Sequence, residues 1–413
     1  MRIGLVSPYD YATPGGVNQH IQHLAGQLRA IGHEVGVLAP SSKKHLRDAG
    51  FHRVGGVVPI PANDSVARIN LNLTLSRRVS EILEQERYDV LHFHEPFMPA
   101  LPLTVLRMSR TANVGTFHAF ARSNVGYYYG RGVLSHYLRR LHATVAVSQP
   151  ARDFVRHYFP AADPAIVPNG VDVTRFRPGL SPIRHLQDDC VNFLFVGRLE
   201  KRKGLRDLLQ AFQYLHQRVP RTRLIIVGEG PLRHRVESFI HSRKLDSVVL
   251  AGRVPAEVLP RYHASADVFC APATGRESFG IILLEAMAAG LPVVCTEIPG
   301  YLSVVEAGVD SLTVRPRSPV ELGAAMTVLA RDALLRKRLG EEGLSKARQR
   351  FAWPVVTSQL MDVYEQARRR ARSTGASAQP PAAVGVGVPQ EPPGWTGMKE
   401  VETRAHDTLP GVG

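Results

Sequence analysis

Two successive series of short apolar segments alternate with helical patterns along this chain, and this alternation limits its possible folds most. The first series predicts strands at residues 2–7, 34–38, 89–94, 113–118 and 143–148. These segments read as fully buried, as strands of a parallel sheet do. A glycine turn at residues 13–16 leads into a predicted helix over 17–31. Strand–helix–strand units of this kind build an α/β fold with parallel sheets.

The second series repeats the pattern after a turn-rich segment at residues 167–172. It predicts strands at residues 191–197, 223–227, 248–251, 268–271 and 292–296, followed by helices at 319–330 and 333–349. Two Rossmann-like domains facing one another across a cleft are therefore expected. We expect the first domain over residues 1–168, the second over 169–351, a terminal helix over 352–371 that packs back on the first domain, and a disordered tail over 372–413.

Charge and cysteine content narrow the class of protein. The chain of 413 residues has 51 Lys and Arg against 36 Asp and Glu, a net charge of +15 that favours anionic partners. Its three cysteines, Cys190, Cys270 and Cys295, are too few and too dispersed for a disulfide framework or a zinc site. No apolar run reaches the ~18 residues of a membrane span. We expect a cytoplasmic protein that is soluble or peripheral at a membrane.

An apolar segment between two glutamates carries the strongest chemical signal. The apolar segment after Ser278 ends at Gly290 and reads as a buried helix with Ser278 as N-cap. Glu277 lies just before this helix and Glu285 lies eight residues later, within it. Glu285 should then be buried, which is costly unless a cation or hydrogen-bond donor meets it. The alternative is a helix that carries one buried ion pair and no ligand.

Two loops lie where a doubly wound fold holds phosphates. Gly15 and Gly16 separate the first strand from the first helix, and glycine allows close backbone approach to an anion. In the second series, Arg198 and Lys203 follow a strand and precede a helix, where they could clamp a diphosphate. Lys201 and Arg202 are expected to be solvated. The alternatives are a tight turn and a basic surface loop.

Histidine ends the predicted strand at residues 113–118. A lone histidine is more often structural than catalytic, yet at the edge of the ligand crevice His118 could hydrogen-bond a sugar hydroxyl or an acceptor. His92, His94 and Glu95 end a neighbouring strand and are expected to line the cleft or belong to the core, because no zinc-like ligand set is evident.

Together these segments resemble the GT-B retaining glycosyltransferases of family 4, over about residues 1–370. The resemblance rests on Pro14-Gly15-Gly16, Thr116-Phe117-His118, Pro168-Asn169-Gly170-Val171-Asp172, Gly197-Arg198 with Arg202-Lys203-Gly204, and the paired glutamates. Within the family the chain looks most like phosphatidylinositol mannosyltransferases, through Ser7-Pro8-Tyr9, Val58-Pro59-Ile60-Pro61, Asn63 with Ser65-Val66-Ala67-Arg68, and His94-Glu95-Pro96. Two features depart from that subfamily. Ala119-Phe120 follows His118 instead of small polar residues, and the spacing from Arg198 to Lys203 is one residue shorter.

The resemblance implies a role for each matching residue. The catalytic group would be His118, Arg198, Lys203 and Glu277, with Glu277 on the transferred sugar and the two cations on the donor diphosphate. Other donor contacts would come from Gly15, Gly16, Val254, Ser278, Phe279, Gly280, Ile281 and Glu285, with Glu285 on the ribose. Acceptor contacts would come from Tyr9, Asn63, Ser65, Arg68 and His118.

The same resemblance implies the reaction. A sugar, mannose from GDP-mannose, would pass with retention to a phosphatidylinositol-type lipid, by front-face displacement and without a required metal or other cofactor. A UDP-sugar donor with another glycolipid or a small polyol is the alternative. A nucleic-acid-binding protein is disfavoured because no RNA or DNA module is recognisable. An inactive scaffold is disfavoured because the motif cations and acids are all present.

A basic segment of the first domain predicts membrane contact at the inner face of the cell membrane. Residues 101–150 contain no Asp or Glu but six arginines, Arg107, Arg110, Arg122, Arg131, Arg139 and Arg140. Tyr127-Tyr128-Tyr129 and Val133-Leu134 could insert among lipid headgroups. The alternative places these aromatics in the core and pairs some of the arginines elsewhere.

Overall fold

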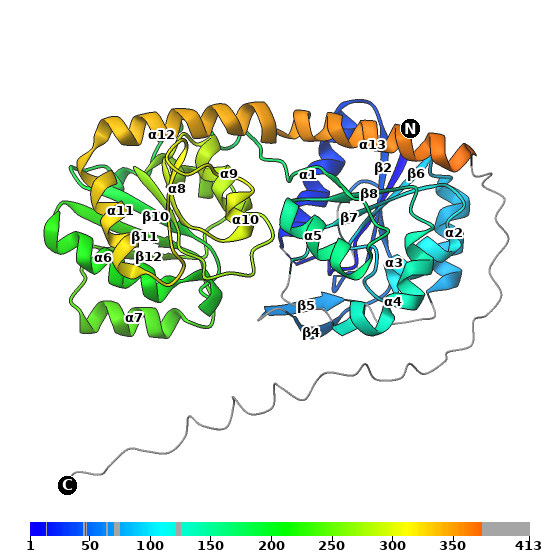
Figure 1. The fold of residues 1–413 in the computed structure, drawn as a ribbon, viewed down its shortest axis with the longest axis horizontal. Coiled ribbons are helices and arrows are strands. Elements are labelled where there is room, and N and C mark those ends of the chain that lie inside the picture. Colours follow the sequence, from blue (N-terminus) through cyan, green and yellow to red (C-terminus); the bar gives the residue numbers. More distant parts are fainter. Residues whose placement is uncertain are drawn as a thin grey trace, which may run out of the picture. The chain divides into compact units, whose positions relative to one another are not determined.

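The computed structural model describes residues 1–13, 15–43, 46, 48–62, 65–69, 75–120 and 125–373, with the side chains of 58–62 and 65–69 excepted. Two parallel sheets dominate this part of the chain (Figure 1). The tail predicted over 372–413 begins two residues too early, since the terminal helix includes residues 372 and 373, and the rest of it lies outside the described residues. The expected domain boundary at residues 168 and 169 stays a prediction.

The first sheet has seven parallel strands in the order β3-β2-β1-β6-β7-β8-β9. They are β1 (Arg2–Val6), β2 (Glu34–Ala39), β3 (Phe51–Arg53), β6 (Val90–His94), β7 (Ala112–Phe117), β8 (Ala143–Ala146) and β9 (Ala165–Ile166). The order reverses beside β1, which pairs with both β2 and β6. Ligands bind at such a switch point, beyond the carboxyl ends of the strands. The five predicted strands are confirmed, whereas the short edge strands β3 and β9 gave no clear pattern.

Helices cover both faces of this sheet. One face packs against α1 (Gly16–Ala30) and α13 (Trp353–Ser373), with Ile3 and Leu5 of β1 in the shared core. The other face packs against α2 (Ser76–Glu86), α3 (Leu101–Met108), α4 (Val125–Leu138) and α5 (Gln149–Tyr158). A separate antiparallel hairpin joins β4 (Val58–Ala62) to β5 (Ser65–Ile69).

The second sheet has six parallel strands in the order β12-β11-β10-β13-β14-β15. They are β10 (Val191–Val196), β11 (Thr222–Val227), β12 (Val248–Gly252), β13 (Val268–Ala271), β14 (Val293–Thr296) and β15 (Ser311–Val314). Successive side chains of β10 enter different cores. Phe193 and Phe195 join one hydrophobic cluster, and Leu194 and Val196 join the other. This two-sided burial explains why the strand reads as a continuous apolar run.

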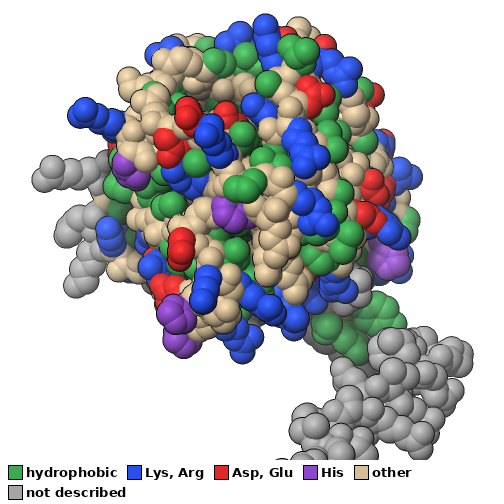
Figure 2. Space-filling view, turned by 90° about the vertical axis from the view of Figure 1, so that its left-hand side faces the viewer, with side chains coloured by type: hydrophobic (Ala, Val, Ile, Leu, Met, Phe, Trp, Pro, Cys, Tyr) green, Lys and Arg blue, Asp and Glu red, His purple; other side chains and the backbone are tan. Residues whose placement is uncertain are grey.

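The helices of the second half follow the same plan. One cluster contains residues of α6 (Leu205–Arg218), α7 (Arg233–Ser242), α11 (Pro319–Arg331) and α12 (Ala333–Lys346). The other contains residues of α9 (Ile281–Ala288), α10 (Pro299–Leu302) and the π-helical turn Ala347–Phe351, beside α8 (Leu259–Ala264). Figure 2 shows the molecule from the side of α6, α7 and α11, where basic side chains are interspersed with acidic ones.

The terminal helix α13 returns the chain to the first sheet, as the sequence predicts. It buries a stripe of residues with helical spacing against the core of that sheet: Val356, Leu360, Val363, Tyr364, Ala367 and Ala371. A backbone bridge between Val171 and Ala352 joins the segment before the second sheet to the start of this helix. Among the described residues, no helix combines the length and apolar character that crossing a bilayer requires.

Candidate active site

A short basic turn follows β10. Residues Lys201–Lys203 form one 3-10 turn, which ends at Gly204 in the left-handed region with φ 72°. A Cβ at Gly204 would lie 1.9 Å from the carbonyl oxygen of Pro272, so no larger residue fits without moving the backbone. The glycine therefore fixes the position from which Lys203 projects.

Ion pairs connect this turn to the paired-glutamate loop. Glu200, only 4% exposed, accepts from Arg198 at 3.0 Å and from Nε of Arg202 at 3.1 Å. Arg202 also pairs with Glu277, and Nζ of Lys203 lies 2.7 Å from Oε1 of Glu277. Glu277 and the cations expected to hold a diphosphate thus form one charged network.

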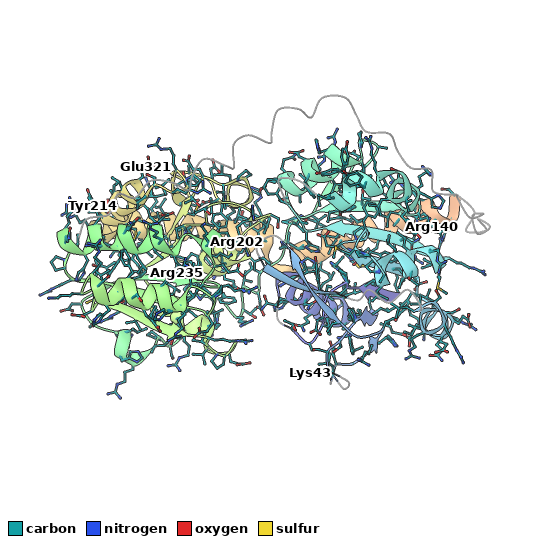
Figure 3. The ribbon with its side chains drawn as sticks, turned by 90° about the horizontal axis from the view of Figure 1, so that it is seen from below. Lys43, Arg140, Arg202, Tyr214, Arg235 and Glu321 are labelled. Carbon is teal, nitrogen blue, oxygen red and sulfur yellow. The ribbon has the colours of Figure 1, made fainter. Side chains whose placement is uncertain are left out.

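The prediction that Arg202 is solvated is wrong. Its side chain is 20% exposed and contacts two carboxylates, whereas Lys201 is exposed as expected. Figure 3 shows Arg202 on the side of its domain nearest the first sheet, away from Tyr214 and Glu321. The 3-10 turn explains the difference, because its residues point in different directions about the turn axis.

The helix of the glutamate motif begins later than the sequence predicts. Helix α9 starts at Ile281 and its N-cap is Gly280, with φ 139°. The prediction that Ser278 is the N-cap is therefore wrong. The carbonyl oxygen of Ser278 instead accepts a hydrogen bond from the hydroxyl of Ser148, at 2.6 Å. Glu277 consequently lies on a loop that one residue of the first half of the chain holds in place.

Glu285 lies on α9 between buried residues but is itself partly exposed, which corrects the expectation of full burial. Removal of the carboxyl group from water raises its pKa to about 7, although the positive charge of Arg175 acts in the opposite direction. A carboxylate at this position can accept hydrogen bonds from a diol such as a ribose.

Apolar side chains lie beside these polar groups. Val254 and Ile281 are both partly buried against the cluster that contains Phe279, which is 3% exposed. This neighbourhood has the character expected of a surface that contacts a base or ribose.

Helix α1 begins at Gly16, with Gly15 as an extended N-cap. A Cβ at Gly16 would meet only Cδ1 of Ile281, at 3.9 Å, and a Cβ at Gly15 would meet nothing within 4 Å. Protein packing therefore requires neither glycine. The free space lies at a helix N-terminus, where backbone N–H groups and the helix dipole favour an anion.

A buried carboxylate holds the backbone around His118. Oε1 of Glu95 accepts from the backbone N–H of His118 and of Ala119, each at 2.7 Å. Glu95 is 3% exposed, and burial raises its pKa to about 7. His118 is 8% exposed, and burial holds its pKa well below the usual value, so its imidazole is neutral at pH 7. A neutral imidazole can donate or accept one hydrogen bond to a sugar hydroxyl.

The predicted acceptor residues are only partly described. Tyr9 lies near Glu95, whose charge adds to burial in raising the pKa of the Tyr9 hydroxyl. Ser65 and Arg68 belong to β5, where Arg68 pairs with Pro59, but their side chains lie outside the described residues. Asn63 lies outside them altogether.

A pocket of about 660 Å³ lies beside the glutamate loop, lined by residues that include Ser148, Pro168, Phe279, Leu302 and Arg350. Its walls come from both halves of the chain, like the contact between Ser148 and Ser278. The sequence predicts Phe279 as a site residue but gives no signal for the remainder of this pocket.

Four residues around the site were not assigned a functional role from sequence: Arg202, Glu200, Glu95 and His20. Arg202 and His20 meet partners distant in sequence, Glu95 acts through the backbone, and Glu200 pairs with Arg198 and Arg202 in its own turn. The only available signal was position, since Glu200 and Arg202 adjoin predicted site residues and Glu95 ends a strand at the ligand edge.

Comparisons with known proteins agree with this arrangement. The model of "Glycosyltransferase Family 4" matches residues 14–175, and that of "Glycosyl transferases group 1" matches residues 182–346. A phosphatidyl-myo-inositol mannosyltransferase of Mycobacterium tuberculosis is 38% identical over 376 residues, covering 88% of this chain and 97% of the relative.

Solved structures share the fold. A glycosyltransferase from Rickettsia africae superimposes with a TM-score of 0.72 at 18% identity, covering 89% of this chain and 98% of its own. The Anabaena HepE protein, solved in complex with UDP and glucose, gives 0.68 at 20% identity, covering 88% and 99%. With two parallel sheets, a returning terminal helix and both family models in order, the chain belongs to the group 1 (family 4) glycosyltransferases, a family of retaining hexosyltransferases with the GT-B fold.

Proposed function

We propose that this enzyme transfers mannose from GDP-mannose, with retention of configuration, to a phosphatidylinositol-type lipid. The observation that carries the proposal is the 38% identity, over nearly the whole length, with a relative named for that reaction. The motif residues that the family resemblance assigns to the donor are present, and three of them, Arg198, Lys203 and Glu277, belong to one ion-pair network.

The donor diphosphate would lie between the N-terminus of α1 and the basic turn. Arg198 is 58% exposed and paired at one side with Glu200, so much of its side chain remains accessible to an anion. Lys203 would exchange its contact with Glu277 for the phosphates, and Glu277 would then turn to the sugar. The cations would stabilise the negative charge on the departing nucleotide, and this stabilisation does not require a metal ion.

His118 and Glu285 would complete the donor contacts. A neutral His118, held at its backbone by Glu95, offers one hydrogen bond beside the reacting sugar. Glu285 would accept from the ribose hydroxyls, and Val254 with Ile281 would contact the nucleoside. The leaving phosphate itself would assist the acceptor hydroxyl on the front face of the sugar, because no second carboxylate is proposed to act as a nucleophile.

Contact with the acceptor membrane would involve α4. Its exposed side chains Val125, Tyr128, Tyr129 and Val133 have the spacing of one helical face. Tyr127 and Leu134 are buried and are not part of that face, which corrects the expectation that they insert among headgroups. Arg140 donates to the carbonyl oxygens of Leu106, Arg107 and Ser109, so it serves the end of α3.

A transfer assay with defined donors and acceptors tests the proposal. The full-length protein would be incubated with GDP-mannose, UDP-glucose or UDP-N-acetylglucosamine, each with phosphatidylinositol vesicles or free myo-inositol. Mannosylated phosphatidylinositol from GDP-mannose is the expected product, and its anomeric configuration reports retention. If only a UDP-sugar were turned over, the proposed donor would be wrong. If sugar were transferred only to free inositol, the proposed acceptor would be wrong.

A further inference from the structure

Three buried histidines converge from three separate elements next to the proposed site. His20 comes from α1, His94 ends β6 and His118 follows β7. Each offers one ring nitrogen, and these nitrogens all lie within 4.8 Å of one another. Nδ1 of His94 and Nε2 of His118 are 3.0 Å apart and share a hydrogen bond, which a bound ion at these two nitrogens would replace. We refer to His20, His94 and His118 as the histidine cluster.

At least one ring nitrogen of this cluster has no hydrogen-bond partner among the described residues. Nε2 of His94 is unpartnered, although the residue is 0% exposed. The ring of His20, which is 5% exposed, has a side-chain contact with Asn169 that falls short of good hydrogen-bond geometry. A buried polar atom without a partner is costly, so such atoms in a native protein usually meet a water or an ion.

His92 shows what a purely structural histidine looks like in the same region. Its Nδ1 lies 2.8 Å from the hydroxyl of Tyr364, and its Nε2 lies 2.7 Å from Oγ1 of Thr116. Both nitrogens are used, although the ring lies beside that of His94 at a centroid distance of 4.3 Å. Burial of histidines here therefore does not by itself leave nitrogens unpartnered.

The donor set selects a class of ion. It contains three imidazoles, and the nearby Glu95 carboxylate is occupied with the backbone of His118 and Ala119. Magnesium, calcium and manganese prefer oxygen ligands, whereas Zn²⁺ and its neighbours in the transition series bind imidazole well. Three histidines with an open fourth position are a known way of holding zinc.

We propose that the histidine cluster is a binding site for one Zn²⁺ ion, and that bound zinc withdraws His118 from sugar transfer. Zn–N bonds of 2.0–2.1 Å place tetrahedral ligand nitrogens about 3.4 Å apart, so small ring rotations would close the site. His118, at 8% exposed, is the least buried member of the cluster. The site goes beyond the proposed function, because it regulates the enzyme and supplies no catalytic step.

Cobalt is a suitable probe, because four-coordinate Co²⁺ with nitrogen ligands absorbs visible light far more strongly than octahedral Co²⁺. The metal-free, full-length protein would be titrated with Co²⁺ and then with Zn²⁺. We expect a visible band that saturates at one equivalent and disappears when zinc displaces cobalt. A weak octahedral spectrum, or no saturation near one equivalent, would overturn the proposal.

Two substitutions test the ligands separately. His94→Gln and His20→Asn should each weaken Zn²⁺ binding by more than the ~10–100-fold that loss of an outer partner costs. His23→Gln is the matched control, because His23 stacks on Trp353 outside the cluster, and it should leave affinity unchanged. Cys190→Ser provides a second control for adventitious binding to the one cysteine that is not buried.

A measurement on the wild-type protein tests the zinc site even if the substituted proteins do not fold. X-ray absorption of the zinc-loaded enzyme should report three imidazoles around the ion. Fewer than three imidazoles, or tight binding that persists in both folded variants, would mean that the cluster holds water only. Zinc should also inhibit transfer, but the spectroscopic and affinity measurements stand even if the proposed donor or acceptor is wrong.

Discussion

Lys203 and Glu277 form an ion pair across two loops, with Nζ and Oε1 2.7 Å apart. Both side chains are largely buried, at 11% and 16% exposure, and Arg202 joins them from the same basic turn. The two residues proposed to hold different parts of the donor thus neutralise each other's charge. Donor binding would have to exchange these contacts.

Removing either partner should reduce transfer far more than it reduces stability. Lys203→Ala and Glu277→Gln should each lower kcat by about 10²–10³, the cost of losing one aimed charge in a transition state. Glu277 keeps Arg202 as a partner in the first variant, so it is not left as an uncompensated buried charge. Steady-state kinetics and thermal melts would measure the two effects. Lys201→Ala, an exposed neighbour, is the control, and near-normal kcat in either test variant would remove that residue from the mechanism.

Arg202 should require its guanidinium shape as well as its charge. It contacts Glu200 and Glu277 at once, and a lysine ammonium cannot reproduce both directions. We expect Arg202→Lys to lower kcat/KM at least about tenfold, which corresponds to about 1.4 kcal/mol. The exposed Arg206 in the next helical turn serves as the comparison. Equal kinetics for Arg202→Lys and Arg206→Lys would mean that Arg202 is only a surface cation.

Gly16→Ala should weaken donor binding while leaving the fold intact. The added methyl would make only an ordinary contact with Ile281, yet it would occupy the space where the diphosphate is proposed to approach the helix. At least about tenfold weaker GDP-mannose affinity is expected, and calorimetry would measure it. Gly26→Ala lies on the same helix with open space around it. This control should keep normal affinity and gain up to about 1 kcal/mol of stability from helix propensity.

Stability should depend on pH through Glu95. Its pKa is raised from 4.5 to about 7 in the folded protein. Because the folded state holds this proton more tightly, the contribution is fully present below pH ~4.5 and is lost as pH rises through about 7. Ionisation of Glu95 should therefore lower the free energy of unfolding by roughly 3 kcal/mol, at about 1.4 kcal/mol per pKa unit. Glu95→Gln cannot ionise and should not show this decrease. The difference in Tm between variant and wild type should therefore shift in favour of the variant from pH 5 to pH 8.

The exposed Glu257 provides the matched comparison for this experiment. Glu257→Gln should keep a constant difference in Tm across the same pH range. A Glu95→Gln difference that is also independent of pH would show that the carboxyl is ionised throughout, with an ordinary pKa.

Anionic vesicles should bind the enzyme through the exposed face of α4. Tyr129 and Val133 are 76% and 62% exposed, and Arg131 lies between them on the same helix. The double variant Tyr129→Ser/Val133→Ser should co-sediment less with phosphatidylglycerol or phosphatidylinositol vesicles, because the inserted apolar area is lost. Binding of the wild type should fall as salt rises.

A substitution elsewhere controls for general loss of apolar surface. Leu334 on α12 is 82% exposed, and Leu334→Ser should leave vesicle binding unchanged. Equal binding of the wild type to neutral and anionic vesicles would contradict the prediction and favour a soluble acceptor.

The sequence alone determined the two series of buried strands, their connection by helices and the return of the terminal helix. These features follow from local periodicity, since a strand buried on both faces and a helix with one apolar stripe each leave a pattern within a few residues. The family motifs also indicated which loops form the site. The basic turn, the glutamate loop and His118 are recognisable because each lies at the end of a strand or the start of a helix.

Tertiary structure decided which polar side chains meet. Lys201 and Arg202 are adjacent, yet only Arg202 reaches Glu277, 75 residues later. Likewise, His20 joins His94 and His118 because α1 packs near the carboxyl ends of β6 and β7. Periodicity reports which face of an element is buried, but a charge or an imidazole leaves no such pattern. Its partner is set by the packing of distant elements, where desolvation makes an unpaired group costly.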